Sequence, residues 1–141
     1  MAKGKFFNRG RIMNHFPLPI TTVITGLLAL TLVGISVRVT MLRAAKGISM
    51  FDGGDKQLGQ AMRVQGNFIE YVPMALLLLA LLEWMGTKPW LIYSLGIALV
   101  VARASHAWGL YSNVFKARAF GSSVTWLVLA IEGLMALSVV A

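Results

Sequence analysis

The chain has 141 residues, of which 57% are hydrophobic and only 13% are charged, and it contains no cysteine. A soluble domain of this length cannot bury so much apolar surface, so the composition indicates a single-domain membrane protein and excludes disulfides and thiol catalysis by the protein itself. The formal net charge is +8. Because the basic residues are spread along the chain, we assign this charge to loops that face anionic lipid head groups and expect no nucleic-acid binding.

A basic tail, residues 1–16, precedes the first apolar run. That run predicts a helix over residues 17–46, which is long enough to cross a bilayer. The Gly- and Asp-rich segment 47–55 predicts a loop. A second helix is expected over residues 56–85. Its purely apolar part is too short to span a membrane unless the polar residues before it also lie inside the helix.

A tight turn between two tryptophans follows, and a third helix is expected over residues 90–112. A short basic loop with Lys116 and Arg118 then leads to a fourth helix, expected over residues 119–141. Short connections between four spans require antiparallel neighbours. The chain is therefore predicted to be an all-α membrane protein, a single domain of four transmembrane helices in an up-down-up-down bundle.

This alternating topology places nearly all polar residues of the spans on one side of the membrane. Ionisable groups in such positions usually face a bundle interior or a water-filled site. The arrangement predicts a net-positive pocket that is open to one membrane face and attracts an anionic, water-soluble ligand. We expect no metal there. The residues on this side are Arg43, Lys46, Arg63, Asn67, Glu70, Arg103, His106, Lys116 and Arg118.

Two motifs give the chain a resemblance to a known family. The first has the form Arg-x-Gln-x-Asn-x-x-Glu-Tyr-x-Pro and reads Arg63, Gln65, Asn67, Glu70, Tyr71 and Pro73 in this sequence. The second is an Arg followed three residues later by a His, here Arg103 and His106. With Arg43 twenty residues before Arg63, these patterns resemble the MAPEG family, the membrane-associated proteins in eicosanoid and glutathione metabolism.

The resemblance implies a homotrimer that binds glutathione near the cytoplasmic face, with a lipophilic substrate arriving from the bilayer. It implies that a first group of residues binds glutathione and that Arg103 either binds the tripeptide or pairs with Glu70. His106 would be a further contact, as would Tyr111, which lies one residue beyond the family's Tyr position at Leu110. A straight alignment places Ala117 at the family's catalytic Arg, whereas a one-residue shift places Arg118 there. The first group comprises Arg63, Gln65, Asn67, Glu70 and Tyr71.

A guanidinium lowers the pKa of a nearby thiol and so favours the thiolate. We expect Arg118 or Arg43 to hold the glutathione sulfur in this form. The predicted activity is that of a glutathione transferase that attacks lipophilic electrophiles, with reduction of lipid hydroperoxides as a second activity. The implied partners are glutathione, a lipophilic electrophile or lipid hydroperoxide, and membrane lipid.

Other readings remain open. The fold also suits a non-enzymatic lipid-binding scaffold or a small four-helix multidrug transporter, which would need an acid within a span, such as Glu132 or Glu70. An alternative for three of the basic residues is that they are ordinary bases at the membrane interface with no role in a site; these are Arg43, Lys116 and Arg118. Charge counting gives five bases on each side and does not orient the protein. The resemblance favours a cytoplasmic site, and the compact length suits a bacterial inner membrane.

Overall fold

The computed structural model describes residues 18–140. It contains four long helices: α2 (Pro19–Lys46), α3 (Lys56–Trp84), α4 (Pro89–Tyr111) and α5 (Phe115–Val140). Each is long and apolar enough to cross a membrane. At 1.5 Å per residue they are about 35 to 44 Å long, against about 30 Å of hydrocarbon in a bilayer. The predicted all-α class with four spans is confirmed; the tail 1–16 lies outside the described residues.

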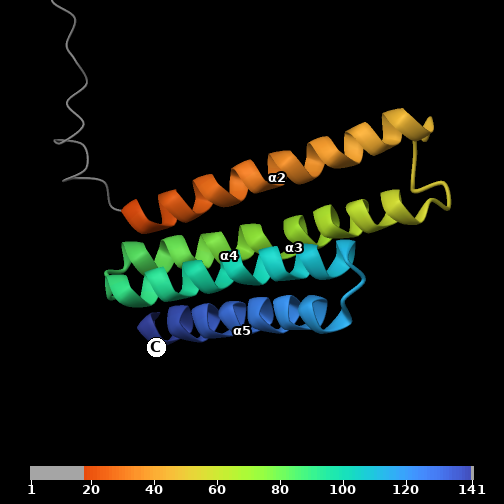
Figure 1. The fold of residues 1–141 in the computed structure, drawn as a ribbon. Coiled ribbons are helices and arrows are strands. Elements are labelled where there is room, and N and C mark those ends of the chain that lie inside the picture. Colours follow the sequence, from red (N-terminus) through yellow and green to blue (C-terminus); the bar gives the residue numbers. More distant parts are fainter. Residues whose placement is uncertain (1–17, 141) are drawn as a thin grey trace, which may run out of the picture.

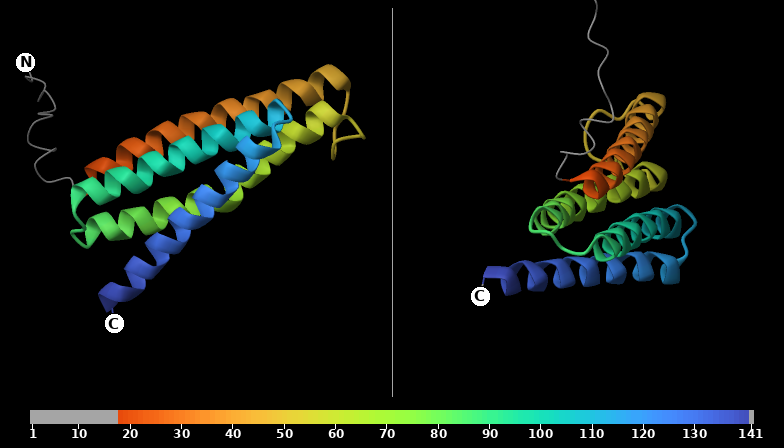
Figure 2. Two further views of the ribbon diagram at one scale, coloured as in Figure 1. Left: turned by 60° about the horizontal axis from the view of Figure 1, so that its bottom comes forward. Right: turned by 90° about the vertical axis from the view of Figure 1, so that its left-hand side faces the viewer.

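The helices run alternately up and down, as Figure 1 shows. The right-hand view of Figure 2, which looks roughly along the helices, shows α2 and α5 on opposite outer sides with α3 and α4 between them. The core follows this arrangement, because the side chains that are fully buried on α3 and α4 pack between the two outer helices. We call the end of the bundle that contains residues 47–55 and 112–114 the pocket end.

Local chemistry explains where the helices begin and end at the pocket end. Gly47 follows α2 with φ of 64°, a left-handed conformation that glycine adopts without strain. Asp55 caps α3, because its side chain accepts a hydrogen bond from the Leu58 N–H at 2.8 Å. Lys46 forms an ion pair with Asp55 at 2.6 Å. These contacts hold the end of one helix beside the start of the next.

The start of α5 differs from the prediction. The helix begins at Phe115, four residues earlier than residue 119, so Lys116 and Arg118 lie in its first turns and not in a loop. Asn113 adopts a φ of 55°, and the Val114 N–H donates to the Gly109 carbonyl at 2.9 Å, which closes a tight turn directly after α4. This turn leaves no room for a basic loop and places Arg118 on a helix surface.

Close packing joins α4 to α5. A side chain added at Gly121 would place its Cβ 2.5 Å from the Ala102 carbonyl oxygen and 2.6 Å from the His106 backbone nitrogen. A Cβ at Gly109 would lie 2.4 Å from the Arg118 backbone nitrogen. Two glycines, one on each helix, therefore let the backbones approach at the level of the predicted site.

Candidate functional site

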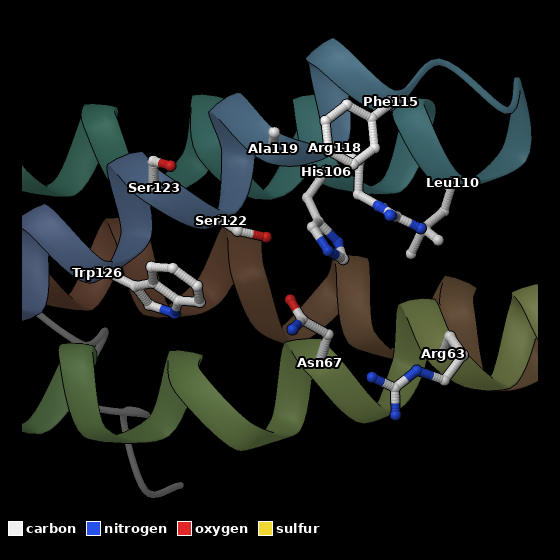
Figure 3. A pocket seen from close by; sticks show the side chains of 10 residues that line it. All are labelled: Arg63, Asn67, His106, Leu110, Phe115, Arg118, Ala119, Ser122, Ser123 and Trp126. Carbon is white, nitrogen blue, oxygen red and sulfur yellow. The ribbon is translucent and has the colours of Figure 1, made fainter.

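A cavity of about 430 Å³ opens between α3, α4 and α5. Arg63 and Asn67 come from α3, His106 from α4 and Arg118 from α5, and Figure 3 shows these side chains converging on the same space. The spacing places them there: Arg63 and Asn67 are four residues apart and share a helix face. The remaining lining residues are Leu110, Phe115, Ala119, Ser122, Ser123 and Trp126.

The pocket is cationic. Arg63 and Arg118 are both exposed and line it from opposite helices, and no acidic residue is among its lining side chains. Arg118 also lies against the Phe115 ring, with 5.3 Å from the guanidinium carbon to the ring centroid. Such stacking restricts a long flexible side chain while its N–H groups stay available. The site can therefore hold an anion between two guanidinium groups.

Arg103 lies outside the pocket lining and supports the pocket by binding Asn67. It is 5% exposed and donates to Asn67 Oδ1 at 2.6 Å, to the Gly121 carbonyl at 3.1 Å and to Thr125 Oγ1 at 2.5 Å. One guanidinium on α4 thus joins α3 to α5. The bond to Asn67 fixes the amide oxygen and leaves the Asn67 NH₂ group as a donor toward the cavity.

Arg103 does not pair with Glu70. The prediction offered that pairing as one of two roles, but the Arg103 donors are directed at Asn67, Gly121 and Thr125, and Glu70 is exposed on the surface of α3. Within the described chain, Lys46 and Asp55 form the only ion pair. The physical reason is the close approach at Gly121, which brings a carbonyl and a hydroxyl of α5 within reach of the guanidinium.

Several predicted site residues lie outside the pocket lining. Gln65 donates to Ser36 Oγ at 2.9 Å and so joins α3 to α2. Arg43 lies against Met62, with 3.4 Å between Nη2 and the sulfur. Tyr71 is half-buried on α3 and, like Glu70, is absent from the lining.

The structure separates Tyr111 from Arg118. Tyr111 packs with Val39, Leu58 and Ala61, and the Arg38 guanidinium lies 4.6 Å from its ring centroid, whereas Leu110 lines the pocket. Consecutive helical residues point about 100° apart, so Leu110, and not Tyr111, shares this cavity with Arg118 within the described chain.

The contribution of α5 beyond Arg118 was missed from the sequence. Ser122 and Trp126 follow Arg118 at intervals of four residues, which is the spacing of one helix face. The sequence therefore contains this four-residue spacing, but the spacing defines a helix face that includes Arg118 only if Arg118 lies in the helix. The prediction placed Arg118 in a loop. Phe115 was missed for the same reason.

The fold and the site define an integral membrane protein of four helices, with a cationic pocket near one end of the bundle. The MAPEG family model matches residues 21–138. Two curated relatives, both named inner membrane protein YecN, come from Escherichia coli strains K12 and O6:H1 CFT073. Each is 36% identical to this chain over 101 residues, which cover 72% of this chain and 77% of the relative. The chain belongs to the MAPEG family.

Proposed function

We propose that this protein is a membrane glutathione transferase that binds glutathione in the pocket between α3, α4 and α5. The observation that carries the proposal is the pair Arg63 and Arg118, which face a common cavity with no acid in its lining. Glutathione has two carboxylates, one ammonium group and one thiol. Carboxylates form their strongest hydrogen bonds with guanidinium groups, often in a bidentate geometry.

Each polar group near the pocket has a role in this proposal. Arg63 binds a glutathione carboxylate, and Asn67 donates to a peptide carbonyl. Glu70, three residues after Asn67 on α3, takes the ammonium group at the edge of the site. His106 adds a polar contact from α4, and Arg103 acts through Asn67 by holding its amide.

Arg118 stabilises the thiolate. The thiol proton leaves to water, and the sulfur lone pair then attacks the electrophilic carbon of a lipophilic substrate. A carbon–sulfur bond forms, and the leaving group departs with its bonding electrons. Arg118 suits this role better than Arg43 because it lines the cavity, whereas Arg43 lies against Met62. A fixed positive charge favours the thiolate over the thiol.

In the complete proposal the protein is an inner-membrane homotrimer whose pocket faces the cytoplasm, where glutathione is abundant. The MAPEG family and the name of the YecN relatives support this placement. The exposed position of Glu70 on a membrane-spanning helix also supports an assembly, since a carboxylate facing lipid alone is costly.

The test is glutathione binding and conjugation by the purified protein. Wild type should bind glutathione, show its ultraviolet thiolate absorbance and conjugate it to 1-chloro-2,4-dinitrobenzene. Arg118→Gln should lose the thiolate signal at saturating glutathione, and Arg43→Gln is the matched control that retains it. Arg63→Gln should weaken binding by roughly tenfold, as expected for one charged hydrogen bond, and keep the thiolate signal at saturation.

Three results would contradict the proposal. Wild type that does not bind glutathione would exclude a transferase and favour a lipid-binding scaffold. Loss of the thiolate signal in Arg43→Gln but not in Arg118→Gln would show that Arg43, and not Arg118, stabilises the thiolate. Binding without conjugation, together with turnover of a lipid hydroperoxide, would move the activity from transferase to peroxidase.

A further inference from the structure

A second, smaller cavity adjoins the pocket at the pocket end of the bundle. It has a volume of about 200 Å³ and shares three lining residues with the pocket, namely Leu110, Phe115 and Arg118. We call this cavity the outer chamber; its other lining residues are Gln60, Gly109 and Asn113. The same three helices therefore surround both cavities, and the outer chamber also contacts the turn between α4 and α5.

The positions of the lining residues along the helices place the outer chamber beyond the pocket, toward the pocket end. Gln60 precedes Asn67 by seven residues, so both lie on one face of α3, about 10 Å apart along the helix axis. On α4, Gly109 lies almost one turn closer to the end of the helix than His106. The outer chamber thus continues the space between the three helices past Leu110.

The other end of the pocket lies within the membrane. Figure 3 shows Trp126 at the end of the pocket that is far from Leu110. Trp126 is about 16 Å along α5 from Phe115, and it is 56% exposed on a membrane-spanning helix. This side of the pocket faces hydrocarbon, which an ion enters only at high cost. A water-soluble anion therefore reaches the pocket from the pocket end, through the outer chamber.

One hydrogen bond crosses this route. Gln60 Nε2 donates to Asn113 Oδ1 at 2.8 Å and joins α3 to the turn between α4 and α5. Within residues 18–140, no other hydrogen bond links α3 to residues 112–114. The backbone at Asn113 is held by the bond from the Val114 N–H to the Gly109 carbonyl, whereas Gln60 has a long side chain. A change of the Gln60 rotamer is therefore sufficient to break the link.

We propose that the Gln60–Asn113 hydrogen bond is a gate across the aqueous mouth of the pocket, which a water-soluble anion passes when the Gln60 side chain moves away. Arg118 lines both cavities, so its charge attracts an anion in the outer chamber and still contacts it in the pocket. The identity of this anion as glutathione rests on the proposed function, whereas the gate requires only a small anion.

A reporter thiol in the pocket tests the gate without any bound ligand, because the chain contains no cysteine. Ser122→Cys in lipid nanodiscs is modified either by anionic 2-sulfonatoethyl methanethiosulfonate or by lipophilic N-phenylmaleimide, which arrives from the bilayer. Adding Asn113→Gly removes the amide and keeps the left-handed turn. It should accelerate the anionic reagent about fivefold, as expected for the loss of one neutral hydrogen bond, and leave the maleimide rate unchanged.

Two further variants define the contact. Gln60→Ala should have the same effect as Asn113→Gly, and the double variant should add nothing, because both changes break one hydrogen bond. The matched control is Gln57→Ala, which removes an exposed glutamine that lies almost one turn earlier on α3 and outside the outer chamber. This control should leave the rates of both reagents unchanged.

Binding kinetics separate a gate from a binding residue, with glutathione sulfonate as the probe. A gate closes over the empty and the occupied pocket, so Asn113→Gly should raise the association and dissociation rates together and leave the Kd unchanged. Wild type that does not bind this probe would contradict the proposed function, and the reporter thiol would still decide on the gate.

Three outcomes would overturn the gate. An unchanged rate of the anionic reagent in Asn113→Gly would show that anions enter by another route. Equal acceleration of both reagents would show a general loosening of the bundle. A weaker Kd with an unchanged association rate would make Gln60 and Asn113 part of the binding site.

Discussion

The carboxylate of Glu83, near the end of α3, accepts a hydrogen bond from the backbone N–H of Thr21 at 2.7 Å. Its other oxygen accepts from the N–H of Ile20 at 2.9 Å. The residue at the N-cap of α2, Leu18, has no side chain that could do this. A residue more than sixty positions later therefore satisfies the first N–H groups of α2 and places a negative charge at the positive end of the helix.

Replacing Glu83 should consequently destabilise the start of α2. We expect Glu83→Ala to lower the free energy of unfolding by about 1 kcal/mol, the usual cost of losing a helix cap. Glu83→Gln should cost less, because one oxygen can still accept. Thermal unfolding in detergent measures both. Lys88→Ala, a charge change at the same end of the bundle, serves as control, and an equal loss there would contradict the capping role.

Gly121→Ala should disturb both stability and the pocket. The new methyl group would lie 2.5 Å from the Ala102 carbonyl oxygen, so α4 and α5 must separate. We expect a loss of about 1–3 kcal/mol in unfolding free energy. The separation also moves two acceptors away from Arg103, so glutathione affinity should fall.

The matched control is Gly133→Ala on the same helix. No atom lies within 4 Å of a Cβ at Gly133, and alanine favours a helix, so this variant should be neutral or slightly stabilising. Equal behaviour of the two variants would show that the close approach at Gly121 is unimportant.

Asp55 predicts a dependence of stability on pH. The hydrogen bond from Lys46, followed by that from the Leu58 N–H, lowers the pKa of Asp55 below its ordinary value of 3.8. The folded state therefore favours the carboxylate, and the unfolded state binds the proton more readily. The stabilisation is present above pH 3.8 and is lost as the pH falls through the lowered pKa of the folded state.

Asp55→Asn keeps a helix cap and removes the charge. Its melting temperature should lie below that of wild type at neutral pH, and the difference should shrink as the pH falls below 4. A series of thermal melts from pH 7 to pH 3 measures this. A constant difference across the series would show that the Lys46 ion pair contributes nothing to stability.

Glu132 is a buried carboxyl group in α5. It is 0% exposed, and neither of its oxygens has a hydrogen-bond partner within the described chain. Burying an unpaired polar group is unfavourable, so Glu132→Met should stabilise the purified protein by about 1–3 kcal/mol. Glu132→Gln retains two unpartnered polar atoms and should bring no such gain. A loss of stability in Glu132→Met would contradict this account of Glu132 as an unfavourable buried group.

The sequence was sufficient for the helices because their signal is strong and local. Apolar runs of spanning length identified all four, and only the start of α5 was displaced. Lys116 and Arg118 misled the prediction because charge was taken to indicate a loop. The turn that precedes them depends on the left-handed conformation of Asn113, which has little signature in a single sequence.

The site was predicted in part. Arg63, Asn67, His106 and Arg118 do line one cavity, since each lies at the pocket end by topology. The partners of Arg103 were not predictable, because they depend on how closely α5 approaches α4, and that distance is set by the absence of side chains at Gly109 and Gly121.

The hydrogen bonds of Arg103 have a consequence for how the protein is made. Its acceptors on α5, the Gly121 carbonyl and the Thr125 hydroxyl, lie 18 and 22 residues later in the chain. During synthesis, a chain that has inserted only its first three helices carries a guanidinium in the membrane without these acceptors. Arrival of α5 supplies them and completes the wall of the pocket at the same moment. A chain truncated before this helix therefore leaves the Arg103 guanidinium with Asn67 Oδ1 alone among the three acceptors described above.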